Sequence, residues 1–78
     1  MGKTLYTPQN LALISMLKKV RIDKGVTQIE LSYKIDKTQS YVAKYENNER
    51  ALKIIEFLQI CEAPEIDPVE IINAIKNI

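Results

Sequence analysis

The sequence contains no histidine and a single cysteine, and these scarcities remove several chemistries. With Cys61 alone, one chain cannot assemble the usual zinc sites built from cysteine and histidine ligands. A nucleophile activated by histidine is equally impossible, and one cysteine cannot form an internal disulfide. We therefore expect neither a metal nor another cofactor, and we do not expect an enzyme.

Long apolar runs are also missing. The longest uninterrupted run is Leu11–Ile14, far short of the ~20 residues that cross a bilayer. The N-terminus lacks the order of basic, apolar and small residues found in a signal peptide. We therefore expect a cytoplasmic protein that does not bind membranes. With 78 residues, two glycines and three prolines, it should form one domain with little loop.

The net charge of +1 conceals an uneven distribution along the chain. Residues 1–53 hold ten basic and five acidic residues, a net charge of +5, whereas residues 54–78 hold one basic and five acidic residues, a net charge of −4. Such an asymmetry points to a polyanionic partner for the basic part. The pattern needs support from motifs, because short chains also divide unevenly by chance.

Start and stop signals define two helices in the first half of the chain. Thr7 followed by Pro8 predicts a helix start, with the threonine as the cap and proline at the first helical position. Gly25 predicts that this helix ends in a left-handed residue. The segment Thr27–Glu30 is a capping box, which predicts a short second helix. The inward positions expected from helical spacing are Leu13, Ile14, Met16, Leu17, Val20, Leu31 and Ile35.

A tight turn and a third helix follow. Asp36 tolerates the left-handed conformation that the turn needs. Thr38 then caps a helix that runs to about Asn47, with Val42 and Tyr45 facing inward. Residues 27–47 are therefore predicted to form a helix, a tight turn and a second helix.

Two further helices complete an all-α chain. Apolar residues at a repeated spacing of three predict a fourth helix with inward positions Leu52, Ile55, Leu58 and Cys61, widened by Ile54 and Phe57. Pro64 ends this helix, and Asp67 with Pro68 starts a fifth helix over about residues 67–77. The fifth helix has two apolar stripes, Val69/Ile72 and Ile71/Ile75/Ile78. We expect one stripe to seal the core and the other, Ile71, Ile75 and Ile78, to meet its copy in a two-fold dimer.

Residues 28–47 resemble the helix-turn-helix of the phage Cro/repressor-like (XRE) family. The similarity covers about residues 12–75 and includes Gly25, Thr27-Gln28, Thr38–Val42 and Tyr45–Asn47 in the family's order and spacing. It implies a five-helix, lambda-repressor-like DNA-binding domain over residues 10–78, preceded by a short N-terminal arm over residues 1–9.

The resemblance also implies a function. It indicates a sequence-specific transcriptional regulator, most simply a repressor, that binds double-stranded DNA at a pseudo-palindromic operator as a homodimer. Such a protein would work in a bacterial or phage context and associate with the nucleoid when bound. An alternative function keeps the fold but binds protein, as an antitoxin-like partner or a co-regulator.

The residues expected to read DNA bases lie in the first turns of the third helix. A major groove about 12 Å wide admits one helix that presents short polar side chains. Gln39, Ser40 and Lys44 are such residues. Glutamine can bind adenine with two hydrogen bonds, and lysine can reach guanine acceptors or a phosphate. The resemblance implies base contacts for these three positions.

Five other residues are expected to contact phosphates, namely Gln28, Thr38, Tyr41, Asn47 and Arg50. Gln28 lies at a helix start, where an amide side chain and exposed backbone N–H groups can meet a phosphate. Thr38 is first of all a cap. Tyr41 could equally pack its ring over the turn, so its role stays open between the two. The resemblance implies the phosphate contact for Arg50, which Asn47 joins.

Other positions carry structural expectations. In the family, a base on the first helix often pairs with an acid at the end of the third, so we expect Arg21 and Glu46 to form a partly buried ion pair rather than to contact DNA. Ser32 adds a hydroxyl to the contact between the second and third helices. Pro64-Glu65 predicts a short or bent link before the fifth helix, which leaves the dimer geometry open.

Overall fold

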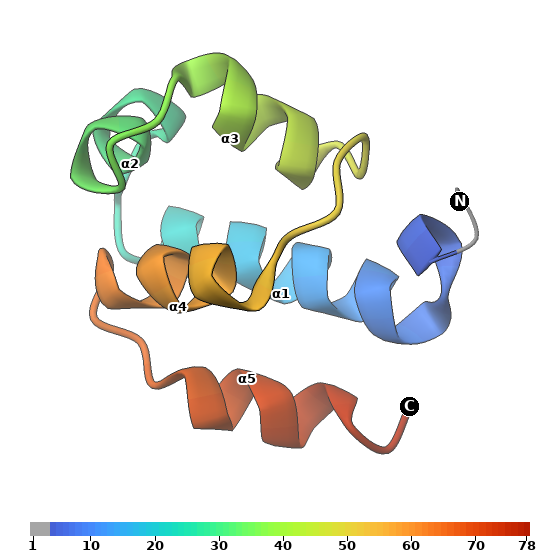
Figure 1. The fold of residues 1–78 in the computed structure, drawn as a ribbon. Coiled ribbons are helices and arrows are strands. Elements are labelled where there is room, and N and C mark those ends of the chain that lie inside the picture. Colours follow the sequence, from blue (N-terminus) through green and yellow to red (C-terminus); the bar gives the residue numbers. More distant parts are fainter. Residues whose placement is uncertain (1–3) are drawn as a thin grey trace.

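The computed structural model describes residues 4–78, and every regular element within them is helical. A 3-10 turn, η1 (Thr4–Tyr6), precedes the α-helices α1 (Pro8–Asp23), α2 (Gln28–Lys34), α3 (Gln39–Glu46), α4 (Ile54–Glu62) and α5 (Pro68–Ile75). Figure 1 shows α1 and α4 at the middle level, α2 and α3 on one side of them and α5 on the other. The all-α, five-helix prediction is confirmed. Residues 1–3 of the expected N-terminal arm lie outside the described residues.

The helix starts follow from the capping residues predicted by the sequence. At four of the α-helices, a side-chain oxygen of the cap accepts a backbone N–H of the first turn. The pairs are Thr7 Oγ1 with Asn10 N (3.2 Å), Thr27 Oγ1 with Glu30 N (3.1 Å), Thr38 Oγ1 with Tyr41 N (3.1 Å) and Asp67 Oδ1 with Val69 N (3.0 Å). The predicted caps are therefore confirmed. None of the helices in residues 4–78 combines the length and apolarity needed to span a membrane.

Four turns share one left-handed geometry. The backbone angle φ is positive at Gly25 (71°), Asp36 (57°), Asn48 (59°) and Glu65 (58°). After each, the next N–H donates to the carbonyl five residues earlier, which closes the helix end. These bonds are Val26 to Arg21 (3.1 Å), Lys37 to Ser32 (2.9 Å), Glu49 to Lys44 (2.8 Å) and Ile66 to Cys61 (2.8 Å). The predictions for Gly25 and Asp36 are confirmed, and Glu65 gives the link before α5 the same form.

The core combines side chains from all five α-helices. Its buried apolar residues are Ile14, Leu17, Leu31, Ile35, Val42, Tyr45, Phe57, Ile60, Cys61 and Ile71, with Leu13, Met16 and Val20 partly buried against them. The inward positions predicted for α1 to α3 are therefore confirmed. Burial raises the pKa of the Cys61 thiol to about 11. The added hydroxyl of Ser32 is also buried, and it donates to the Ile29 carbonyl at 2.6 Å.

The inward face of α4 differs from the prediction. Ile55 and Leu58, which were expected to face inward, are 61% and 40% exposed. The buried face consists of Phe57, Ile60 and Cys61. A strict spacing of three residues drifts around an α-helix by about 60° per step, so it cannot stay on one face. Steps of three and four residues together can.

The two apolar stripes of α5 also need a correction. Ile71, expected in the dimer contact, is 3% exposed and belongs to the core, because α5 packs against α1 and α4. Ile75 is half-buried and Ile78 is exposed. The exposed stripe contains Val69 and Ile72, which are 55% and 41% exposed. The chain therefore uses Ile71 to seal its own core.

The N-terminal turn is fastened to the end of α3. Asn10 Nδ2 donates to the Leu5 carbonyl and to Asn48 Oδ1, both at 3.0 Å. Asn48 Nδ2 donates to the same Leu5 carbonyl at 2.7 Å. Three hydrogen bonds thus connect η1, α1 and the loop that follows α3. This connection was not predicted from the sequence.

Candidate nucleic-acid interface

α2 and α3 form the predicted helix–turn–helix, and α3 has one buried and one exposed face. Val42 and Tyr45 hold its inner face and are 0% exposed. Gln39, Ser40 and Lys44 lie on its exposed surface. A helix that packs one face against the core and presents polar side chains on the other has the shape that major-groove binding requires. The assignment of these three residues to bases stays a prediction.

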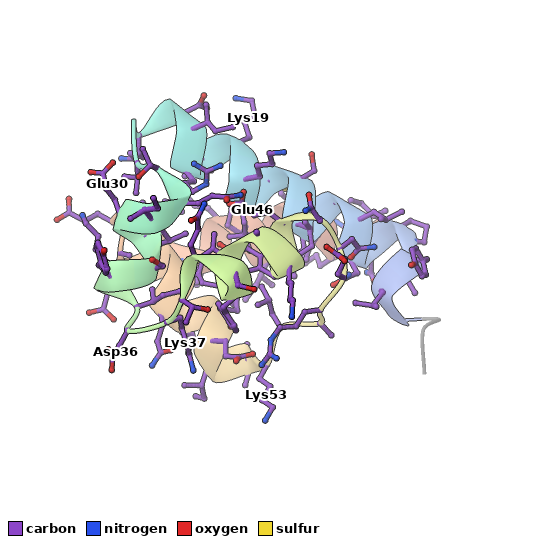
Figure 2. The ribbon with its side chains drawn as sticks, turned by 90° about the horizontal axis from the view of Figure 1, so that it is seen from above. Lys19, Glu30, Asp36, Lys37, Glu46 and Lys53 are labelled. Atoms are coloured by element: carbon purple, nitrogen blue, oxygen red, sulfur yellow. The ribbon has the colours of Figure 1, made fainter. Side chains whose placement is uncertain are left out.

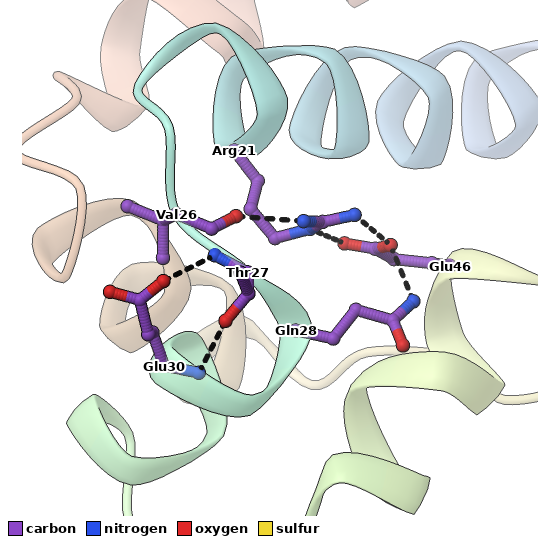
Figure 3. Close-up of polar contacts among 6 residues, drawn as sticks. All are labelled: Arg21, Val26, Thr27, Gln28, Glu30 and Glu46. Carbon is purple, nitrogen blue, oxygen red and sulfur yellow. Dashed lines mark hydrogen bonds and ion pairs between the residues drawn. The ribbon is translucent and has the colours of Figure 1, made fainter.

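The predicted ion pair between Arg21 and Glu46 is confirmed (Figure 3). Arg21 Nε and Nη2 bind the two oxygens of Glu46 at 2.7 and 3.0 Å, and Nη1 donates to the Val26 carbonyl at 2.7 Å. The side chain of Glu46 is 1% exposed and that of Arg21 is 11% exposed. Because this two-pronged contact joins the end of α1 to the end of α3, it fixes the orientation of α3.

Gln28 joins the same cluster. Its Nε2 donates to Glu46 Oε1 at 3.0 Å, so α2 is tied to the end of α3 as well (Figure 3). The side chain is half-buried. An amide has two N–H donors and a carbonyl oxygen, so contact with Glu46 is compatible with contact to a phosphate. The structure therefore gives Gln28 a structural bond beside the phosphate contact predicted for it.

The capping box fixes the first turn of α2, in which Gln28 lies. Glu30 N donates to Thr27 Oγ1, and Thr27 N donates to Glu30 Oε1, both at 3.1 Å. These hydrogen bonds with Thr27 hold the pKa of Glu30 below its ordinary value. The predicted capping box is confirmed.

The other residues predicted to contact phosphates lie around the ends of α3. The Thr38 hydroxyl is used as the cap, and Asn47 is exposed at the C-terminal end of the helix. Tyr41 is half-buried, and the guanidinium carbon of Arg50 lies 4.9 Å from the centre of its ring. Arg50 also pairs with Glu56 at 3.2 Å, while its side chain stays 45% exposed. The structure thus brings Tyr41 and Arg50 together.

Glu56 also belongs to this site, although it was not predicted from the sequence. Its Oε1 accepts a hydrogen bond from Lys53 N at 2.9 Å, and its Oε2 pairs with Arg50. The Lys53 N–H, helped by the Tyr41 hydroxyl and by Arg50, holds the pKa of Glu56 below its ordinary value. The hydrogen bond between Lys53 N and Glu56 could have been predicted from the sequence, because acids are favoured in the first turn of a helix. The pairing with Arg50 could not, because it depends on the path of the loop.

Basic side chains gather beside α3. Figure 2, which looks onto this helix, shows Lys37 on one side of it and Glu46 on the other. Lys44 and Arg50 are exposed on the same part of the chain. The carboxylate of Glu46 is 1% exposed and compensated by Arg21. The surface around α3 can therefore attract a polyanion.

Exposed apolar side chains also lie on α4 and α5. They are Ile54, Ile55, Leu58, Val69 and Ile72, here called the α4–α5 surface. It borders a hollow of about 250 Å³ lined by Leu13, Leu52, Lys53, Ile54, Phe57, Ile72 and Ile75. No group of three or more histidine, cysteine or acidic side chains in residues 4–78 is placed to hold a metal ion.

Known proteins share this sequence pattern and this fold. Residues 17–71 match the family model described as helix-turn-helix. The chain is similar to an XRE-family like protein from Pseudomonas syringae pv. tomato str. DC3000, with 35% identity, coverage of 96% of this chain and 92% of that chain, and a TM-score of 0.87.

Restriction-modification controller proteins are similar too. The wild-type controller protein C.Esp1396I shares 27% identity, with coverage of 91% of this chain and 93% of that chain and a TM-score of 0.81. The same controller has been solved as a tetramer in complex with its natural 35-base-pair operator, with 27% identity, the same two coverages and a TM-score of 0.80. Among curated proteins, no sequence match was found.

Proposed function

Because the chain belongs to the XRE family of helix-turn-helix DNA-binding transcriptional regulators, we propose that it is a repressor that reads a pseudo-palindromic operator as a homodimer. The observation that carries this proposal is the exposed polar face of α3, with Gln39, Ser40 and Lys44 on a helix whose other face is fully buried. The controller protein solved with its operator supports double-stranded DNA as the partner.

In this proposal the exposed face of α3 supplies sequence specificity. The Gln39 amide can donate to N7 and accept from N6 of adenine, Lys44 can donate to the N7 and O6 acceptors of guanine, and the Ser40 hydroxyl can serve either base. Each well-placed pair of hydrogen bonds to a base contributes about 1–3 kcal/mol of discrimination against the wrong base.

Phosphate contacts supply most of the affinity and little of the specificity. Gln28, Thr38, Asn47 and Arg50 are assigned to this role directly, and Tyr41, whose hydroxyl is buried, is assigned to it through the cations that its ring contacts. Each phosphate that a lysine or arginine neutralises steepens the dependence of log K on log salt by about 0.9. Arg50 is the only one of the five that carries a charge, so its loss should change the salt dependence, whereas the loss of Asn47 should not.

The homodimer is proposed to form through the α4–α5 surface rather than through Ile71. The five exposed apolar side chains of this surface would leave water on association, and the exposed Ile78 and half-buried Ile75 would lie at its edge. A two-fold axis through such an interface would place two copies of α3 on successive major grooves, about 34 Å apart. A pseudo-palindromic operator follows from that symmetry.

Selection of bound sequences from random duplexes at two salt concentrations tests the proposal. We expect two inverted half-sites one helical turn apart. Gln39→Ala and Lys44→Met should relax base preference at single positions of the site. Arg50→Gln should weaken binding to all sequences about equally and reduce the salt dependence.

Two outcomes would count against parts of the proposal. If no sequence is enriched and every duplex is bound with the same salt-sensitive affinity, the chain does not read bases, and the alternative of a protein-interaction module gains support. If sedimentation shows a monomer at high micromolar concentration, the homodimer is wrong. Ile72→Lys should abolish the dimer, with Lys76→Gln at the C-terminal cap of α5 as the matched control.

A further inference from the structure

Two cations from different segments converge on one aromatic ring beside α3. Lys37 Nζ, from the turn before α3, lies 5.4 Å from the centre of the Tyr41 ring. The guanidinium carbon of Arg50, from the loop after α3, lies 4.9 Å from the same centre. Both distances are within the roughly 6 Å at which an aromatic ring attracts a cation. α3 separates the two cations in sequence, and the Tyr41 ring brings them together.

The Tyr41 ring is held in place by its packing, and its hydroxyl is buried. Tyr41 packs edge-to-face on Tyr45, with ring centres 5.8 Å apart, and Tyr45 is 0% exposed. The Tyr41 hydroxyl is buried beside the Glu56 carboxylate and the Arg50 guanidinium. Burial, with the Glu56 carboxylate nearby, raises the pKa of Tyr41 to about 12. At neutral pH the ring is therefore uncharged, and its hydroxyl points away from solvent.

Arg50 has a second restraint. Its Nη2 lies 3.2 Å from Glu56 Oε2, and the other oxygen of Glu56 is held by Lys53 N. The arginine side chain is nevertheless 45% exposed. A guanidinium has five N–H donors, so one contact to Glu56 leaves others for a phosphate. Arg50 is thus held from one side by Glu56 and from another by Tyr41.

We propose that Tyr41 is a positioning residue, whose ring gathers Lys37 and Arg50 into a prearranged pair of cations for the phosphates of one DNA strand. Lys37 then becomes a phosphate-contacting residue, and Tyr41 acts through the two cations rather than through its hydroxyl. The inference rests on the proposed function, because DNA must lie against α3 for this pair to meet it.

The geometry suits the spacing of phosphates. Two cations within 5.4 and 4.9 Å of one point are at most about 10 Å apart. Each DNA strand carries one phosphate per roughly 3.4 Å of helix axis, so both cations can meet phosphates of the same strand. Lysine and arginine side chains lose much rotamer freedom when they bind. A ring that restricts them beforehand lowers that cost.

The test measures the affinity of the full chain for a duplex over a range of salt concentrations. Lys37→Gln and Arg50→Gln should each reduce the slope of log K against log salt by about 0.9. Tyr41→Leu removes no charge but should raise the dissociation constant about threefold to tenfold for all sequences. Tyr41→Phe keeps the ring and should bind like the natural chain. Lys76→Gln, at the C-terminal cap of α5, is the control for loss of a distant cation.

A double-mutant cycle separates positioning from a structural role. In a chain that already carries Lys37→Gln and Arg50→Gln, Tyr41→Leu should cost nothing further, because no cations remain to be positioned. Tyr41→Met, which fills the space without an aromatic face, provides a second ringless variant if the leucine variant folds poorly. Melting temperatures of all variants confirm that binding is measured on folded protein.

Three results would overturn the inference. Tyr41→Phe binding as weakly as Tyr41→Leu would mean that the hydroxyl contacts DNA. An unchanged cost of Tyr41→Leu in the double variant would mean that the ring acts without the cations. Sequence-selective binding that Tyr41→Leu and Tyr41→Met leave intact would refute the positioning role alone. If the natural chain itself bound all duplex sequences equally well, the proposed function would be refuted instead.

Discussion

Replacement of Arg21 by methionine is expected to destabilise the fold rather than to remove a DNA contact. The substitution keeps a long unbranched side chain but withdraws the cation from Glu46, whose side chain is 1% exposed. Glu46 would keep the hydrogen bond from Gln28 Nε2. A single neutral donor does not offset the cost of a charged carboxylate held away from water.

The size of this effect follows from the burial of the pair. Removing one partner of a buried ion pair costs about 3–5 kcal/mol. At about 0.05–0.15 kcal/mol per residue, a chain of 78 residues has a total stability of roughly 4–12 kcal/mol. Since each kcal/mol shifts the melting temperature of a small domain by about 4–8 °C, Arg21→Met should lower it by at least about 12 °C. Arg21→Met combined with Glu46→Leu should recover much of this loss, because no unpaired charge remains.

Thermal unfolding followed by circular dichroism measures the melting temperature, and urea unfolding measures the free energy of unfolding. Binding to a random-sequence duplex at low salt measures the phosphate contacts of the folded protein. Lys19→Met is the matched control, because Lys19 lies on the same helix and its pair with Asp23 is exposed on both sides. The control should leave the melting temperature nearly unchanged. If Arg21→Met abolished DNA binding without lowering the melting temperature, Arg21 would be a DNA contact and the reasoning would be refuted.

Four further predictions test other parts of the structure. The pKa of Glu56 lies below its ordinary value of 4.5. The contribution of the Glu56 carboxylate to stability is therefore present above about pH 4.5 and is lost as the pH falls through the folded-state pKa. The difference in unfolding free energy between the natural chain and Glu56→Gln should shrink as the pH is lowered from 7 to 3. Ile60→Ala should cost about 2–5 kcal/mol, whereas Ile55→Ala should change the melting temperature little in the monomer and weaken any dimer seen by sedimentation. Gly25→Ala should cost about 1–2 kcal/mol, because φ is 71° there and alanine is strained in the left-handed conformation. No steric clash adds to this cost, since no atom lies within 4 Å of the added carbon. Because Cys61 is 0% exposed and burial raises its pKa to about 11, a thiol reagent should label it only when the chain opens, and rapid labelling of the folded chain would contradict this.

The parts of the fold that the sequence predicted are those that depend on neighbouring residues. A cap such as Thr38 acts on an amide three residues away, and a left-handed residue such as Asp36 closes a helix within its own turn. These signals are local, so they can be read without knowing the path of the chain. They were enough to place the helix–turn–helix and hence the exposed positions of α3.

The parts that the sequence did not predict depend on how distant segments meet. Both faces of α4 are rich in apolar residues, so only its packing against the other helices shows that Ile60 is buried and Ile55 is exposed. The pairing of Arg50 with Glu56 depends on the course of the loop between α3 and α4. The Arg21–Glu46 pair was predicted only because the family resemblance implies it.

The hydrogen bonds of Asn10 and Asn48 to the Leu5 carbonyl have a consequence for protein engineering. Residues 4–6 precede the segment 17–71 that matches the family model, yet Leu5 holds the loop at the end of α3. A graft that transplants only the helix–turn–helix onto another scaffold would leave Asn48 without this partner while it keeps its left-handed backbone. A chimera should therefore carry the N-terminal turn with the helices, and an affinity tag is better attached at the end of the chain that follows α5.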